Sequence, residues 1–157
     1  MRNAILIGSA TCLAVAGGLA LFLGSGANGQ ESGLPYTDTA RVAAGAVVYQ
    51  DYCASCHGAN LEGEPNWKTP DADGYLPAPP HDPTGHTWHH DDALLIQIVT
   101  HGTEAIVGGT YKSRMEGYGD ILTADEILNV LAYIKSTWPD EVRDIHNEIN
   151  ARSAGNG

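Results

Sequence analysis

A five-residue segment, Cys53-Ala54-Ser55-Cys56-His57, constrains the fold of this chain more than any other part of its sequence. Two thiols three residues apart lie on one side of a helical turn, and the next residue presents an imidazole on that same side. This spacing is the attachment signature of a c-type haem, in which the thiols bind the vinyl groups and the histidine ligates the iron. The segment therefore predicts one covalent haem c, with Cys53 and Cys56 as thioether residues and His57 as the proximal iron ligand.

Two other kinds of site also use a pair of cysteines. A thioredoxin-type redox pair does not need the histidine, and it lies near a βαβ pattern that this sequence lacks. A zinc site needs a second pair of ligands, and the chain after residue 30 contains no further cysteine. We therefore favour haem over both alternatives.

The first 30 residues have the composition of an export segment. A positive start at Arg2 is followed by an almost wholly apolar run that begins at Ala4 and ends at Leu23. Small residues before position 28 suit signal-peptidase cleavage after Ala27, but a run of about twenty apolar residues is also long enough to span a bilayer. Residues 1–27 are thus expected to be either a signal peptide or an N-terminal membrane anchor that tethers the protein. Both interpretations place the rest of the chain on the periplasmic side of a bacterial inner membrane.

The net charge of −11 narrows the range of partners. Nucleic acid is not expected as a partner, because phosphate contacts need a basic surface. An acidic electron carrier would be attracted to positively charged docking patches, although the same charge also serves solubility.

Residues 28–38 form a polar linker, and a helix is expected to begin at Asp38 or Thr39 and to run into the haem-attachment segment. Gly45 and Tyr49 lie eight and four residues before Cys53. A glycine inside a helix costs about 1 kcal/mol relative to alanine, and close approach of another helix is one good reason to accept that cost.

These positions resemble the class I cytochromes c, small all-helical proteins with a single haem. The resemblance covers about residues 39–138. It implies an all-α fold in which the N-terminal and C-terminal helices cross near-perpendicular at Gly45 and Tyr49, with Tyr133 packed close by, around one covalently bound haem and a long proline-rich loop. We expect a cytochrome c domain over residues 39–150 and a disordered tail over residues 151–157.

Six prolines between Gly58 and Asp92 exclude a long helix or a central strand from that loop. In class I cytochromes c a carbonyl from a proline-containing turn accepts from the second nitrogen of the proximal histidine, and Pro79 is our candidate here. The indole of Trp88 could contact a haem propionate or simply pack within the loop. His86, His89 and His90 could bind copper or zinc, but their spacing matches no metal motif, and a polar loop is the simpler interpretation.

Met115 is the only methionine besides the initiator, and it lies in a glycine-rich loop before the last predicted helices. A thioether is a soft ligand that suits haem iron opposite a histidine, and this ligation raises the reduction potential. Met115 is therefore our expected distal ligand, with His101, Lys112 and His86 as fallbacks. The family commonly has proline after this methionine; here Glu116 follows it, which we expect to lower the potential.

Helices are further predicted from Asp92 to His101, from a capping box at Thr123 to about residue 137, and from Pro139 to Asn150. The last of these could fold back on the domain or form a partner surface.

A haem with both axial positions filled favours outer-sphere transfer of one electron over chemistry on a bound molecule. The resemblance implies a non-enzymatic electron carrier without a small-molecule substrate, with respiratory or photosynthetic partners such as a bc1-type donor and a terminal oxidase. Three alternatives stay open. The first is a gas-reactive or peroxide-reactive haem protein or sensor with a labile sixth ligand. The second is a metal-handling module built on the loop that contains His86, His89 and His90 (the histidine loop), and the third is a subunit of a larger redox complex.

Overall fold

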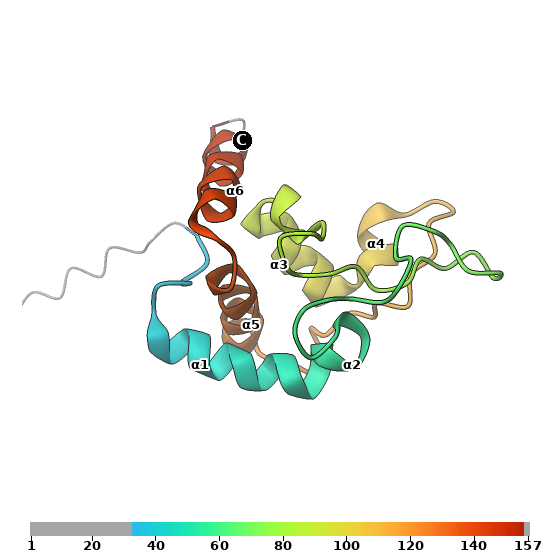
Figure 1. The fold of residues 1–157 in the computed structure, drawn as a ribbon, viewed down its shortest axis with the longest axis horizontal. Coiled ribbons are helices and arrows are strands. Elements are labelled where there is room, and N and C mark those ends of the chain that lie inside the picture. Colours follow the sequence, from blue (N-terminus) through green and yellow to red (C-terminus); the bar gives the residue numbers. More distant parts are fainter. Residues whose placement is uncertain (1–32, 156–157) are drawn as a thin grey trace, which may run out of the picture. The chain divides into compact units, whose positions relative to one another are not determined.

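A computed structural model describes residues 33–155 of the chain. The predicted export segment and the start of the linker, residues 28–32, lie outside these described residues. Residues 33–155 form helices joined by loops, without a β-strand, in agreement with the all-α expectation (Figure 1). Within the same residues, no helix is both long enough and apolar enough to cross a membrane.

The N-terminal helix leads directly into the haem-attachment segment. Helix α1 (Thr39–Val48) begins where the Asp38 carboxylate accepts from the backbone N–H groups of Ala40 and Arg41. It continues through one π-helical turn, η1 (Tyr49–Cys53), into the short helix α2 (Ala54–His57). The sequence did not reveal this wider turn, a feature that often occurs at functional sites.

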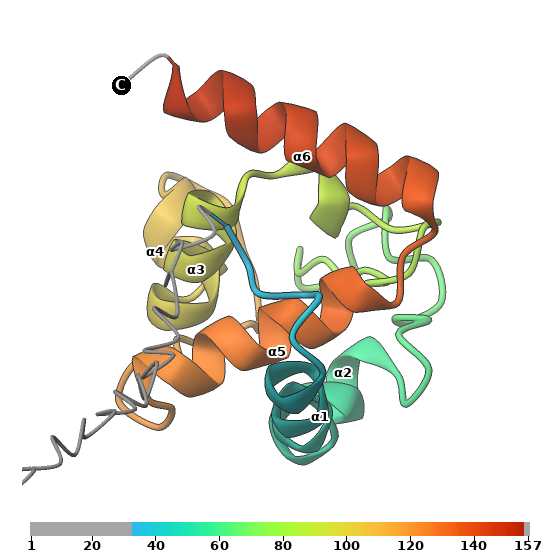
Figure 2. The ribbon, with the colours of Figure 1, turned by 90° about the vertical axis from the view of Figure 1, so that its left-hand side faces the viewer.

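Helices α1 and α5 (Ala124–Ser136) cross at the position that Gly45 predicts. A Cβ atom at Gly45 would lie only 1.9 Å from the carbonyl oxygen of Asn129, so the backbones are in direct contact there. Next to this contact the rings of Tyr49 and Tyr133 pack with centroids 5.4 Å apart. Figure 2 shows α1 end-on while α5 runs across the view, which confirms the near-perpendicular crossing.

Helices α3 and α5 begin at side-chain caps where the sequence predicted them. Asp91 accepts from Leu94 N–H at the start of α3 (Asp92–His101), and Thr123 and Glu126 form the capping box of α5. A short helix, α4 (Thr103–Val107), follows α3 without a side-chain cap.

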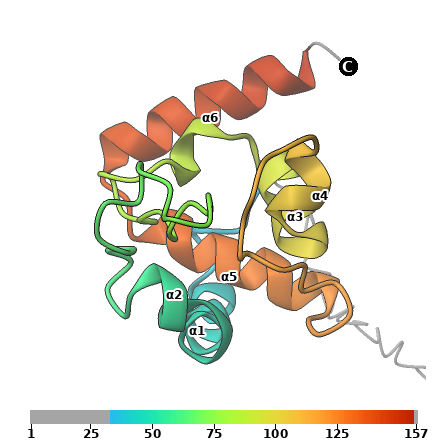
Figure 3. The same cartoon turned by 90° about the vertical axis from the view of Figure 1, so that its right-hand side faces the viewer.

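The last helix, α6 (Asp140–Ala154), is longer than predicted, because residues 151–154 belong to it and not to a disordered tail. It folds back on the domain and packs beside the single 3₁₀ turn η2 (Thr87–His89), as Figure 3 shows. His146 Nε2 lies 2.9 Å from the carbonyl oxygen of His90, and Asn150 accepts from the backbone N–H of Asp92 at 2.7 Å. These bonds tie α6 to the end of the proline-rich loop.

Candidate haem site

The two thiols lie on successive turns of the same helical segment. Cys53 ends η1 and Cys56 lies in α2, where its side chain is exposed; both are free thiols. Burial, and secondarily Cys56, raises the pKa of Cys53 to about 11. A reactive redox pair needs a lowered thiol pKa, so this environment argues against the thioredoxin-type alternative.

The imidazole of His57 is prepared as a neutral ligand. Its side chain is buried, and burial lowers its pKa despite the opposing effect of a bond to Pro79. Nδ1 lies 2.8 Å from the carbonyl oxygen of Pro79, so the proton is expected on Nδ1, donated to that oxygen. The lone pair of Nε2 is then available to a metal, and this is the contact that the resemblance implied for Pro79.

The Pro79 carbonyl is held in place by backbone bonds between residues 61–64 and residues 78–81 of the proline-rich loop. Glu64 N–H donates to the carbonyl oxygen of Ala78 at 2.9 Å, and His81 N–H donates to that of Leu61 at 2.8 Å. Gly63, with φ of +69°, lies where a Cβ atom would be 2.7 Å from the Pro79 carbonyl carbon. Only glycine combines this left-handed conformation with so close an approach.

The phenol of Tyr49 anchors the chain just after His57. Its hydroxyl donates to the carbonyl oxygen of Gly58 at 2.8 Å, and its ring is fully buried. Burial, with smaller contributions from neighbouring groups, raises the pKa of Tyr49, so the hydroxyl stays protonated and can donate. Tyr49 therefore serves both the helix crossing and the haem-attachment turn.

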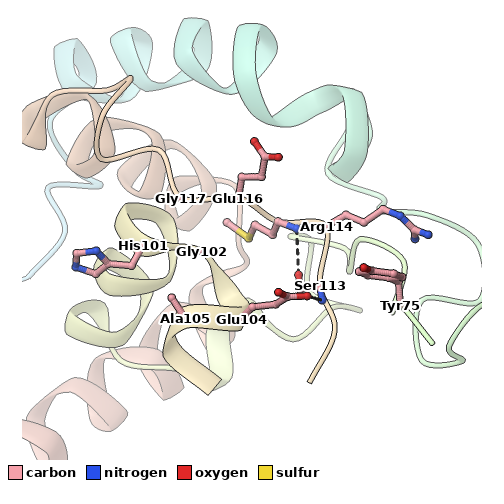
Figure 4. A pocket seen from close by; sticks show the side chains of 10 residues that line it. Tyr75, His101, Gly102, Glu104, Ala105, Ser113, Arg114, Glu116 and Gly117 are labelled. Atoms are coloured by element: carbon pink, nitrogen blue, oxygen red, sulfur yellow. Dashed lines mark hydrogen bonds between the residues drawn. The ribbon is translucent and has the colours of Figure 1, made fainter. Parts of the chain in front are cut away.

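Met115 lines a cavity of about 960 Å³ (Figure 4). The cavity lies between the α3–α4 junction and the loop over residues 113–117, and its lining does not include Cys53, Cys56 or His57. The backbone N–H of Met115 donates to Ser113 Oγ at 3.1 Å, and its carbonyl oxygen accepts from Thr103 N–H at 3.3 Å. The first of these bonds lies within the loop, and the second joins the loop to the junction at Gly102.

Glycine is also required where the loop over residues 113–117, here called the methionine loop, crosses the α3–α4 junction. Gly102 has φ of +84°, and a Cβ atom there would lie 2.9 Å from Gly117 N. A Cβ atom at Gly117 would in turn lie 2.7 Å from the backbone of Thr100 and His101. The two main chains therefore touch at this point.

The residues present fit a covalently attached haem. They supply two free thiols, a buried neutral imidazole whose second nitrogen is already engaged, and a thioether beside a cavity. Cys53 and Cys56 would hold the porphyrin, and His57 and Met115 would ligate the iron.

The fallback ligands lie in less suitable places. His101 lines the same cavity but is exposed to solvent, as is His86. Lys112 donates through Nζ to the carbonyl oxygen of Asp73 at 2.7 Å, away from the methionine loop. Met115 therefore stays our prediction for the distal ligand.

The histidine loop contains two further predicted sites. Trp88 donates its indole N–H to the carbonyl oxygen of Pro83 at 3.2 Å, within its own loop, so a propionate contact stays a prediction. The His86 ring lies 5.1 Å from that of His89 and 4.7 Å from that of His90, measured between centroids. Even so, residues 33–155 contain no group of three or more potential ligands placed to hold a metal ion.

The contact between His81 and His57 was not predicted from the sequence. The ring of His81 stacks on that of His57, with centroids 3.9 Å apart and planes 24° apart. The sequence did show a histidine two residues after the candidate carbonyl of Pro79, but it gave no sign that the two imidazoles would meet.

Comparisons with known proteins agree with this geometry. A family model described as cytochrome c matches residues 42–138. A Cbb3-type cytochrome c oxidase subunit FixP from Sinorhizobium medicae is 30% identical over 96 residues, covering 60% of this chain and 29% of the relative. A nitrite reductase from Stutzerimonas stutzeri is 35% identical over 99 residues, covering 59% of this chain and 15% of the relative. The chain thus spans less than a third of the length of these relatives. No solved structure is a significant match. Because the family model covers more than half of its residues, this chain belongs to the cytochrome c family.

Proposed function

We propose that this protein carries single electrons between redox proteins at the outer face of a bacterial inner membrane, without catalysing a reaction of its own. Haem c supplies the one-electron chemistry when it is bound, since its iron alternates between the ferric and ferrous states. Membership in the cytochrome c family supports haem-based electron transfer. The periplasmic location rests on the apolar run from Ala4 to Leu23 alone.

The observation that carries this proposal is the supply of two axial side chains. His57 is buried with Nδ1 engaged by Pro79, which leaves Nε2 for the iron. Met115 lies beside the cavity, in a loop joined to the start of α4 by the bond from Thr103 N–H to the Met115 carbonyl oxygen. When both side chains are ligands, no position stays open for a substrate, and a site of that kind favours outer-sphere transfer.

The partners are proposed from the relatives and from charge. The relatives include a subunit of a cytochrome c oxidase and a nitrite reductase, so a terminal oxidase or another respiratory reductase is our proposed acceptor, with a bc1-type donor. The chain carries 19 acidic and 8 basic residues, and we therefore expect its partners to present basic docking surfaces.

Carbon monoxide binding to the reduced holoprotein tests the proposal. We expect the wild-type protein to bind no carbon monoxide at neutral pH, because Met115 occupies the distal position. The Met115→Ala variant should bind it readily and should have a lower reduction potential. Lys112→Ala, at the fallback ligand three residues before Met115, serves as the control and should behave as wild type, because Lys112 bonds to Asp73.

A second candidate function has one observation in its favour. Glu116 is exposed and directly follows Met115, the proposed distal ligand. Its negative charge favours the oxidised haem, and its backbone is less rigid than that of the proline that the family commonly has there. Ready binding of carbon monoxide to the wild-type protein would contradict the electron-carrier proposal and would favour a gas-reactive or peroxide-reactive protein.

A further inference from the structure

We infer that His81 is a positioning residue that sets the plane of the axial His57 imidazole. The two rings lie almost parallel, with centroids 3.9 Å apart and planes inclined by 24°. The bond from His57 Nδ1 to Pro79 restrains one edge of the ring. A flat neighbour against the ring face adds a second, independent restraint on its plane.

His81 can act in this way because its own position is fixed from several sides. Its Nδ1 lies 2.6 Å from the hydroxyl oxygen of Thr87, a buried residue of η2. Its backbone N–H donates to Leu61, and its carbonyl oxygen accepts from the indole N–H of Trp138 at 2.7 Å. The ring of Tyr49 meets it edge-on, with centroids 6.2 Å apart and planes at 71°.

An apolar residue could fill the same volume, but it would not impose a plane. An imidazole held by Thr87 has a defined ring orientation, and an aliphatic side chain has none. The stack on His81 and the bond at His57 Nδ1 together therefore define both the position and the plane of the His57 ring.

The plane of an axial imidazole has a direct electronic consequence. It decides which iron d orbitals overlap with the ligand π system, and thereby the electron paramagnetic resonance g-values of the ferric protein. It also decides how unpaired spin is distributed over the haem methyl groups, which proton NMR reports. His81 is thus expected to influence the electronic structure of the site without touching the iron.

The test compares four variants of the full chain as ferric holoprotein. His81→Leu should shift the largest g-value and change the spread or order of the haem methyl resonances. His81→Phe keeps a flat face and should restore the wild-type pattern in part. Thr87→Val, which removes the hydroxyl that orients His81, should shift both readouts in the same direction as His81→Leu. The control is His86→Leu, the same exchange at an exposed histidine, which should leave both readouts unchanged.

The inference rests on haem attachment, and the outcomes separate the two. Unchanged g-values and methyl shifts in His81→Leu and Thr87→Val would overturn the positioning role, even if both variants unfold at lower temperature. If His81→Leu does not mature, Thr87→Val and His81→Phe decide the question by the same readouts. A wild-type protein that binds no haem would overturn the inference together with the haem assignment.

Discussion

Gly45 and Asn129 bring the main chains of α1 and α5 into contact, and a Cβ atom on Gly45 would lie 1.9 Å from the Asn129 carbonyl oxygen. Gly45→Ala should therefore lower the free energy of unfolding by about 1–3 kcal/mol, because the helices must move apart. This loss should exceed the gain of about 1 kcal/mol that alanine usually brings inside a helix. Chemical denaturation of the holoprotein measures the difference. The reverse exchange at an exposed position of the same helix, Ala44→Gly, should cost only about 1 kcal/mol, and a stabilised Gly45→Ala protein would contradict the contact.

Trp138 connects the end of α5 to the proline-rich loop through its indole N–H, which donates to the carbonyl oxygen of His81 at 2.7 Å. The residue is only 2% exposed. Trp138→Phe should reduce the free energy of unfolding by about 2 kcal/mol or more, since it removes the bond and leaves a smaller ring in a packed site. Trp67→Phe, at a half-buried position, should cost less than about 1 kcal/mol by comparison. Equal losses at both positions would show that the bond to His81 contributes nothing.

His146 should make the stability depend on pH. Burial, with a smaller effect of Lys135, lowers the pKa of this histidine, although Asp92, the bond to His90 and Asp91 act in the opposite direction. The unfolded chain, with a pKa near 6.5, therefore binds the proton more readily than the folded one. The contribution of His146 to the free energy of unfolding is complete above about pH 6.5. It is lost as the pH falls, by at most about 1.4 kcal/mol for each pH unit. Denaturation of the wild type and of His146→Gln between pH 7.5 and about pH 5.5 isolates this residue, because the variant should lack its share of the slope. Parallel stability curves would contradict the assignment.

Lys135 is a buried cation, 2% exposed, whose Nζ donates to Asn147 Oδ1 at 2.8 Å and lies 4.6 Å from the centre of the Tyr36 ring. Burial lowers the pKa of Lys135, and the charge of Asp92 acts against that effect. Asp92 is itself buried, and its Oδ1 has no hydrogen-bond partner among the described residues.

Lys135→Met should therefore cost about 1–3 kcal/mol, because it removes the bond to Asn147 and the positive charge that acts on the buried Asp92. Adding Asp92→Asn to that variant should recover part of the loss, as the free energies of unfolding of the single and double variants would show. Losses that simply add would mean that the two charges do not interact.

Local patterns in the sequence predicted most of the helical framework. The Asp38 cap, the capping box at Thr123 and the glycine at position 45 all depend on neighbouring residues or on one backbone contact, and the structure contains each of them. Pro79 was accessible only through the family resemblance, because its bond to His57 spans 22 residues of irregular chain.

Features that depend on long-range packing could not be predicted. The stack of His81 on His57 depends on backbone bonds between residues 61–64 and residues 78–81 of the loop, and no periodic pattern encodes them. The end of α6 was placed too early, because its last four residues, Ala151 to Ala154, carry no apolar repeat. Ser153 there bonds to Asp91 in another element, at 2.7 Å, which a local pattern does not report.

The partner of the His57 ring nitrogen is a main-chain oxygen, an atom that all twenty amino acids possess. Exchanging the side chain at position 79 therefore cannot delete this acceptor. Selection on the basicity of the imidazole must instead act on the backbone path that places the Pro79 carbonyl beside His57. Gly63 allows the backbone at residue 63 to approach Pro79 closely, so it is the position where such selection can act most directly.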